Sequence, residues 1–201
     1  MNNFSPIISL CRREAPINAA SRASRVSGAL RAALLVAAGV CLLSVSAQIK
    51  VPYYPVPQTL QTLAVLLLPF LLGARPAIGA VVSYLALGAA GAPVFAAAAG
   101  GWAHFIGPTG GFLLGFLVAV AALSLCLHLR LVRGFASALL CLLVADALVF
   151  LCGIPWLALA LGGDWQKAFT LGAAPFILGD LGKALLVAGA VALSQRQRRN
   201  A

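Results

Sequence analysis

Charged residues are scarce in this chain of 201 residues: Asp, Glu, Lys and Arg make up only 9% of it, while 62% is hydrophobic. Soluble domains carry about 25% charged and about 45–50% apolar residues. A water-soluble core could not bury this much apolar surface. The composition therefore excludes an ordinary soluble domain and predicts an integral protein of the lipid bilayer.

The sequence also lacks the signatures of metal or redox chemistry. None of its cysteines forms a C-x-x-C pair, and four of them lie inside apolar runs, where a thiol packs as a small apolar side chain. We therefore expect no metal and no cofactor. The cysteines are Cys11, Cys41, Cys126, Cys141 and Cys152.

Strand-like alternation of polar and apolar residues is absent, and the apolar runs are long and rich in Leu, Ala and Val. In a bilayer such runs form helices. The sequence predicts an all-α membrane protein with six transmembrane helices and a glycine-rich loop between the third and the fourth. The expected spans are 30–47, 57–72, 77 to beyond 91, 109–129, 135–152 and 171–193.

Proline and glycine set the expected helix ends. The stretch QIKVPYYPVP interrupts the chain after the first span, and its Tyr53 and Tyr54 suit the membrane interface. We expect Pro57 in the first turn of the second span and Gly73 just after its end. Segment 154–169, with a Pro-Trp start and a Gly-Gly break, is expected to be a short interfacial piece. Glycines that recur every four residues into the fourth span permit close helix contact: Gly107, Gly111 and Gly115.

The stretch 88–111 is rich in glycine and carries no Asp, Glu, Lys or Arg. Irregular backbone at membrane depth survives only where it is buried or lines a cavity, so this stretch is expected to close over a ligand. His104 by itself is weak evidence for a site, because such a histidine more often makes only a local hydrogen bond. Candidate binding residues in and beside the stretch are Tyr84, Phe95, Gly101, Thr109 and Gly110, and Trp102 and Phe105 are further aromatic groups there.

The last apolar run carries the strongest polar signal. Asp180 and Lys183 stand three residues apart in PFILGDLGKALL, so on a helix they share a face and can pair. An ionisable side chain at the centre of a membrane helix costs about 2.5–3.5 kcal/mol, and such residues usually mark a substrate or ion path. A self-neutralising pair that only fixes helix packing is the alternative. Gly182 and Lys183 do not form a phosphate-binding loop, because Ile177 and Ala184 stand where that motif needs Gly and Ser or Thr.

The net charge of +10 follows the expected topology and requires no nucleic acid. Every arginine lies in a terminal tail, at the start of the first span, or in the loops after the second and fourth spans, whereas the other loops hold only Lys50 and Lys167. By the positive-inside rule both termini are cytoplasmic and the number of spans is even. We expect a loosely ordered basic tail at 1–28, a membrane substrate-binding domain at 29–195 and a second basic tail at 196–201. A transit peptide would share the Arg- and Ser-rich character of the first tail.

Five motifs together resemble one family. PVPQTLQTLAVLL, LGAAGAPVFAAAAGG, GPTGGFLLGF, GIPWLAL and FILGDLGKALL resemble, in order and spacing, the BioY family of biotin-binding S components of bacterial energy-coupling factor (ECF) transporters. The resemblance covers about residues 30–194. It implies a six-helix protein of the bacterial cytoplasmic membrane that binds biotin from outside and is not an enzyme. Import would be driven by a separate transmembrane T component and a pair of ATP-binding cassette ATPases.

The resemblance also implies roles for particular residues. In the family the acid and base of the last helix are tied to biotin binding, and the matching positions are Asp180 and Lys183. We expect both at one end of the ligand, the ureido ring. The Ala-x-x-x-Ala signature by which S components dock on the T component matches Ala29–Ala33 or Ala33–Ala37, and packing within this protein is the alternative.

Two other classes of function stay open. Asp146, a third acid within the apolar spans, would form a relay with Asp180 and Lys183 in an ion-coupled secondary transporter for a small vitamin-like substrate. No internal repeat is evident to support that class. Asp146 is also a candidate binding residue, at a position where BioY proteins often carry Asn or another polar residue. A membrane enzyme is the other class, with two histidines and no cluster of metal ligands to serve it.

Overall fold

The computed structural model describes residues 17–51 and 55–200, and the side chains of residues 28–51 and 55–197. Tyr53 and Tyr54, expected at the membrane interface, lie outside the described residues. The chain divides into two units, Met1–Leu34 and Leu35–Ala201. The second unit contains the whole candidate site.

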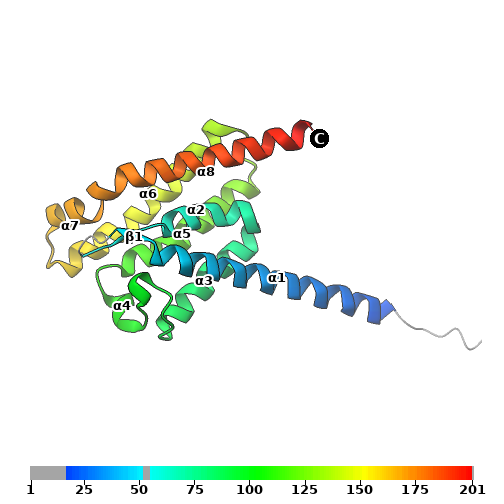
Figure 1. Cartoon of the computed structure of the whole chain (residues 1–201), viewed down its shortest axis with the longest axis horizontal. Coiled ribbons are helices and arrows are strands. Elements are labelled where there is room, and N and C mark those ends of the chain that lie inside the picture. The colour runs from blue at the N-terminus through cyan, green and yellow to red at the C-terminus, as the bar shows by residue number, and fades with distance from the viewer. Residues whose placement is uncertain (1–16, 52–54, 201) are drawn as a thin grey trace, which may run out of the picture. The chain divides into compact units, whose positions relative to one another are not determined.

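Most of the described chain is helical (Figure 1). Two short strands, a turn of 3-10 helix (η1) and a short helix lie between the longer helices. In order the elements are α1 (Ile17–Gln48), β1 (Lys50–Val51), β2 (Gln58–Thr59), α2 (Gln61–Leu72), α3 (Ala74–Ala89), η1 (Ala96–Ala98), α4 (Trp102–Ile106), α5 (Gly110–His128), α6 (Phe135–Ala160), α7 (Trp165–Gly172) and α8 (Ala174–Asn200).

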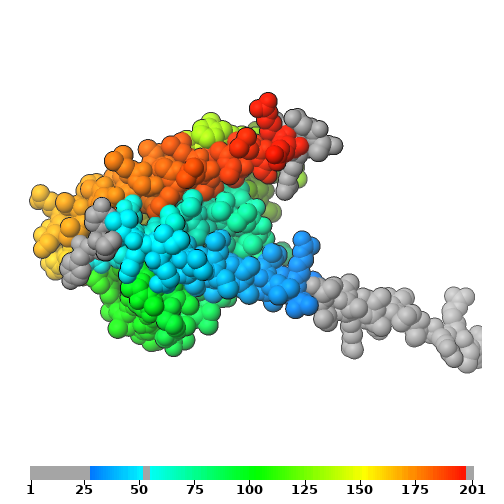
Figure 2. Space-filling model, in the orientation of Figure 1, coloured from blue at the N-terminus to red at the C-terminus, as the bar shows by residue number. Residues whose placement is uncertain are grey.

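Four helical stretches are long and apolar enough to cross a membrane: Gly28–Gln48, Gly110–His128, Phe135–Ala160 and Trp165–Gln197. Helices α2 and α3 are apolar but shorter, with 12 and 16 residues. Helix α8 forms an orange-to-red band at the surface in Figure 2, and its Leu178 is 81% exposed. Exposed leucines of this kind match a lipid environment, so the predicted class of helical membrane protein is confirmed.

The second expected span starts later than predicted. Pro57 does not open a helix, because the chain first forms an antiparallel pair in which Lys50 lies opposite Thr59. The backbone N–H of Leu60 then donates to the carbonyl of Ile49 at 3.0 Å. Helix α2 begins only at Gln61 and ends, as predicted, before Gly73.

The third span was placed too far along the chain. Helix α3 begins at Ala74 rather than at 77, and this start puts Pro76 in the first turn, where the missing N–H costs no hydrogen bond. The helix ends at Ala89 and does not continue past Gly91. Gly91 has φ of +101°, a conformation that ends a right-handed helix.

The prediction of an interfacial piece over 154–169 was wrong. Helix α6 continues through Pro155 to Ala160 and stops before Gly162 and Gly163, whose φ angles are +75° and +93°. The glycine pair, rather than the proline, therefore sets the helix end. Helix α7 follows, with the Asp164 carboxylate accepting a hydrogen bond from the Lys167 backbone N–H at its start.

The second unit is built around α5, which packs against α6, α3 and α2. A Cβ on Gly115 would lie 2.9 Å from the backbone of Val149, and one on Gly111 would meet Trp156. At Gly111 and Gly115 the glycine repeat therefore lets α5 and α6 approach closely, as the sequence predicted. Helix α8 packs along α6 and α2, and this arrangement brings its polar pair next to the start of α2.

Candidate functional site

One pocket of the second unit has an empty volume of about 580 Å³, counting the space at its open mouth. It is lined by parts of α2, α5, α6 and α8, the hairpin end before α2, and the segment between α3 and α5. The lining residues are Val56, Pro57, Thr59, Gln61, Thr62, Phe95, Ala96, His104, Thr109, Phe112, Leu113, Phe116, Val149, Phe150, Phe176 and Asp180.

Five of the sixteen lining residues are phenylalanines. Phe112 on α5, Phe150 on α6 and Phe176 on α8 form a chain of edge contacts, with ring centroids 6.4 and 6.5 Å apart. Gly153 and Gly172 leave the room that Phe112 occupies, because a Cβ on either residue would contact its ring. The pocket therefore offers flat apolar surfaces to a ligand with a ring or an aliphatic chain.

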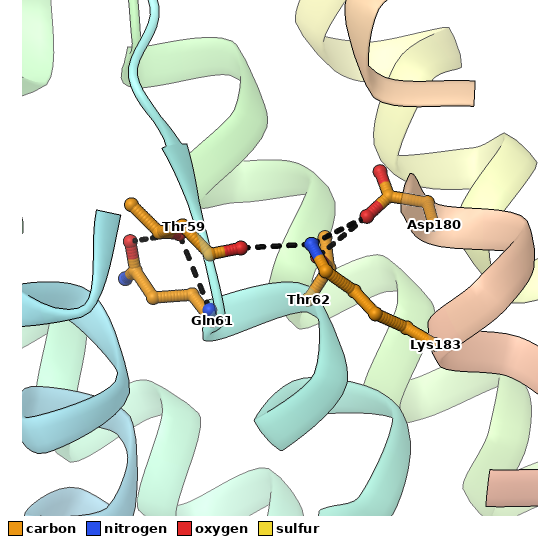
Figure 3. Close-up of polar contacts among 5 residues, drawn as sticks. All are labelled: Thr59, Gln61, Thr62, Asp180 and Lys183. Atoms are coloured by element: carbon orange, nitrogen blue, oxygen red, sulfur yellow. Dashed lines mark hydrogen bonds and ion pairs between the residues drawn. The ribbon is translucent and has the colours of Figure 1, made fainter. Parts of the chain in front are cut away.

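The polar edge of the pocket centres on an ion pair of α8 (Figure 3). The Nζ of Lys183 lies 2.7 Å from the Oδ1 of Asp180, one helical turn earlier. Asp180 is only 1% exposed and Lys183 8%. The predicted pairing of the two residues is thus confirmed, and it places two opposite charges in an apolar surrounding.

Lys183 uses its three N–H donors within the protein. Besides Asp180 they reach the carbonyl of Thr59 at 2.8 Å and the Oγ1 of Thr62 at 2.7 Å. The hydroxyl of Thr62 in turn donates to Asp180 Oδ1 at 2.9 Å. The Oδ2 of Asp180 accepts no hydrogen bond from the described residues, so it is the free acceptor of this cluster.

A second set of hydrogen bonds connects the pocket wall to α3. Thr59 Oγ1 donates to Gln61 Oε1 at 3.1 Å, and Gln61 Nε2 donates to the hydroxyl of Tyr84 at 2.7 Å. Tyr84 is fully buried and donates to the carbonyl of Val94 at 3.1 Å. The tyrosine is therefore a support behind the pocket rather than part of its lining.

Residues 94–106, called here the 94–106 segment, carry Phe95 into the pocket wall. The Phe95 ring is fully buried, lies edge-on to Tyr84 at 5.3 Å and stacks on His104 at 5.3 Å. The ring occupies the place where a Cβ of Gly88 would lie. Burial lowers the pKa of His104 below its ordinary value, so its imidazole is neutral at pH 7.

The other predicted site residues fall into two groups. Thr109 lines the pocket, and its Oγ1 lies 3.3 Å from His104 Nε2. Gly110 and Gly101 do not belong to the pocket lining: a Cβ on Gly110 would meet the carbonyl of Phe105, and Gly101 has φ of +93° at the start of α4.

Asp146 stands apart from the lining. It lies on α6 one turn before Val149, is 8% exposed, and its Oδ1 has no hydrogen-bond partner among the described residues. Its place in binding stays a prediction. The alanines of the expected docking stripe, Ala29, Ala33 and Ala37, are all exposed on α1.

Sequence reasoning missed the threonines that complete the ion-pair cluster. Thr59 and Thr62 belong to the run QTLQT, whose density of polar side chains at the edge of an apolar span was a usable signal. The first residue of the run, Gln58, places its flexible side-chain amide against Gly179 of α8. The aromatic lining by Phe112, Phe150 and Phe176 had no such signal, since phenylalanine is ordinary in any apolar span.

Several known proteins with sequences similar to this chain are biotin transporters named BioY. A probable biotin transporter BioY of Pyrococcus horikoshii is 42% identical over 171 residues, which cover 83% of this chain and 95% of the relative. The biotin transporter BioY2 of Lactococcus lactis is 39% identical over 76% of this chain and 84% of its own. The biotin transporter BioY of Thermotoga maritima is 37% identical over 79% of this chain and 93% of its own.

A solved structure has the same fold. The crystal structure of the S component for biotin from an ECF-type ABC transporter matches with a TM-score of 0.68 at 24% identity, over 90% of this chain and 95% of that one. The sequence model of the BioY family matches residues 18–200. The chain therefore belongs to the BioY family.

Proposed function

We propose that this protein binds biotin in the pocket between α2, α5, α6 and α8 and serves as the substrate-specific S component of an ECF transporter. The observation that carries the proposal is the buried cluster of Asp180, Lys183 and Thr62 at the edge of an aromatic pocket. A mostly apolar pocket with a few convergent polar groups suits a ligand that has fused rings, an apolar chain and a polar head.

Asp180 is assigned to the ureido ring of biotin. The ureido group has two N–H donors, and the Oδ2 of Asp180 is an acceptor that no described residue uses. A hydrogen bond from a neutral N–H to a charged carboxylate in a dry site is stronger than one between neutral groups. Thr59, Gln61 and Thr62 line the same wall and supply further polar atoms.

Lys183 is assigned a supporting role. Its three N–H donors are already taken, so it balances the charge of Asp180 and fixes the carboxylate rather than donating to the ligand. This assignment refines the expectation that both charged residues meet the ureido ring. A buried carboxylate without that partner would be strongly destabilised.

The membrane topology belongs to the same proposal. In this proposal the shorter α2 and α3 cross the membrane together with the four long helical stretches, making six crossings, and the positions of the arginines support cytoplasmic termini. A T component docked on the stripe Ala29, Ala33 and Ala37, and a pair of ATPases, would then energise release to the cytoplasmic side of the bacterial membrane.

Binding of labelled biotin to the purified protein in detergent tests the central claim. We expect saturable binding that unlabelled biotin competes away, without any covalent change in the ligand. ATP-dependent uptake with co-purification of an ATPase separates an S component from an ion-coupled secondary transporter. Uptake driven by an ion gradient alone would contradict the proposal.

A further inference from the structure

Gln48, the last residue of α1, makes hydrogen bonds that the proposed binding site does not explain. Its side-chain Nε2 donates to the carbonyl of Phe95 at 3.0 Å, and its Oε1 accepts from the backbone N–H of Ala98 at 3.0 Å. A carbonyl can only accept and an N–H can only donate, so the orientation of the amide follows from its partners. One side chain thus joins both ends of the same short turn.

This turn has a backbone conformation that its sequence disfavours. Ala97 and Ala98 have φ of +63° and +52°, although only glycine adopts this region without a steric penalty. A further bond within the turn runs from Phe95 N–H to the carbonyl of Ala99 at 3.0 Å. An unfavourable conformation persists when its surroundings hold it, and Gln48 supplies two of the bonds that do so.

The turn is also one of the two parts of the 94–106 segment that touch the pocket, the other being His104. Phe95 and Ala96 line the pocket, and both are buried although their neighbours Ala97 and Ala98 are exposed. Among the hydrogen bonds of the described residues, the Gln48 side chain bonds only to this turn and to the carbonyl of Ser44 in its own helix. Its effect on a ligand would therefore be indirect.

We propose that Gln48 is a positioning residue that latches the 94–106 segment over the ligand pocket, so that breaking its two hydrogen bonds opens the path by which ligand enters and leaves. The inference rests on the proposed function in that the ligand is taken to be biotin. The latch itself is a property of the protein and is present without ligand.

A latch has a kinetic signature that a pocket contact lacks. The apparent affinity for ligand is the affinity of the closed state multiplied by the fraction of molecules that are closed. If this fraction stays near one, the affinity changes little even when the segment opens more often. Entry and exit both require opening, so both rates rise together when the latch is lost. Loss of a direct ligand contact instead raises the dissociation rate alone.

The test compares Gln48→Ala with Gln166→Ala in the full-length purified protein. Gln166 is an exposed glutamine of α7 whose side chain makes no hydrogen bond to the described residues, so it controls for the chemistry of the change. Labelled biotin gives the association and dissociation rates. In a parallel form without native cysteines, Ala96→Cys reports opening through its reaction with a water-soluble thiol reagent in the absence of biotin.

For Gln48→Ala we expect association and dissociation about tenfold faster, a dissociation constant changed by less than about threefold, and labelling of position 96 about tenfold faster. Two neutral hydrogen bonds at a partly exposed site account for an effect of this size. Gln166→Ala should match the wild type. Unchanged rates and labelling in Gln48→Ala would overturn the latch, and so would faster dissociation with unchanged association.

The two readouts also separate this inference from the proposed function. If the wild type does not bind biotin, the proposed function fails, yet faster labelling of position 96 in Gln48→Ala would still support the latch. If biotin binds normally and labelling does not change, the latch alone fails.

Discussion

The hydroxyl of Thr62 donates to the Oδ1 of Asp180 at 2.9 Å, across 118 residues of sequence. The bond joins the first turn of α2 to the second turn of α8. Together with Lys183 it occupies one carboxylate oxygen and leaves the other without a partner among the described residues. The protein thus holds Asp180 in one orientation and keeps one acceptor for a ligand.

Replacing this carboxylate should abolish most biotin binding. Asp180→Asn removes the charge that a ligand N–H would meet, and the loss of a charged hydrogen-bond partner costs about 1.5–3 kcal/mol. We expect roughly 10- to 150-fold weaker binding with normal membrane insertion, measured with labelled biotin on the purified protein. Thr62→Val, which keeps both charges, should weaken binding less. Equal affinity in Asp180→Asn and the wild type would rule out this role.

A methyl group at Gly88 should displace Phe95. A Cβ there would overlap the ring, so Gly88→Ala forces the 94–106 segment away from α3. We expect weaker biotin binding and a lower melting temperature. Gly189→Ala is the matched control, because it lies in α8 with nothing within 4 Å of the added Cβ, and alanine favours a helix by about 1 kcal/mol. If Gly88→Ala left biotin binding and the melting temperature unchanged, Phe95 would be shown to move without a cost in free energy.

Gly101 should be intolerant of a β-branched residue. Its φ of +93° is disfavoured for any residue with a Cβ, and valine adds a stiff side chain at the start of α4. Gly101→Val should therefore impede closure and lower biotin affinity. Biotin should also shield Ala96→Cys, which lies in the pocket wall, from a water-soluble thiol reagent. Labelling that saturating biotin leaves unchanged would mean that the segment is only a connector.

The alanine stripe of α1 should serve transport and not binding. Ala33 is exposed, and a tryptophan in its place would prevent close approach of another helix. Ala33→Trp should bind biotin normally, fail to co-purify with the T component, and lose ATP-driven uptake. If Ala33→Trp instead lost folding and biotin binding while the T component still docked, the stripe would be assigned to packing within this protein.

His104 should make stability depend on pH on the acid side of neutrality. Burial lowers the pKa of the folded imidazole below its ordinary value of 6.5, so the unfolded chain takes up a proton more readily. The stability from neutral His104 is complete above about pH 6.5 and is lost as the pH falls below it. Between pH 7 and pH 5 the melting temperature should fall more for the wild type than for His104→Phe. Equal decreases would contradict this assignment.

The sequence predicts local features of this protein better than its long-range contacts. The pairing of Asp180 with Lys183 is fixed by helical spacing alone, and it was predictable. The start of α2 was not, because Pro57 is compatible with a helix and only pairing between Lys50 and Thr59 decides otherwise. The continuation of α6 through Pro155 is a similar case, since the proline weakens the helix and the packed neighbours maintain it.

The polar partners of Lys183 explain why a site is harder to predict than a span. Thr59 and Thr62 stand more than 120 residues earlier, and no periodicity connects them to α8. Their approach results from the packing of α2 against α8. A rule based on one segment cannot supply such a contact, because two separate segments and the space between them all contribute.

The donors that surround Lys183 also bear on how the protein is made. Helix α8 is synthesised after the other described helices, and its paired Asp180 and Lys183 make it poorly suited to enter lipid alone. The groups that satisfy them lie on a segment synthesised much earlier. We therefore expect the insertion of α8 to be helped by the earlier placement of Thr59 and Thr62, and substitutions at Thr62 to lower the amount of inserted protein.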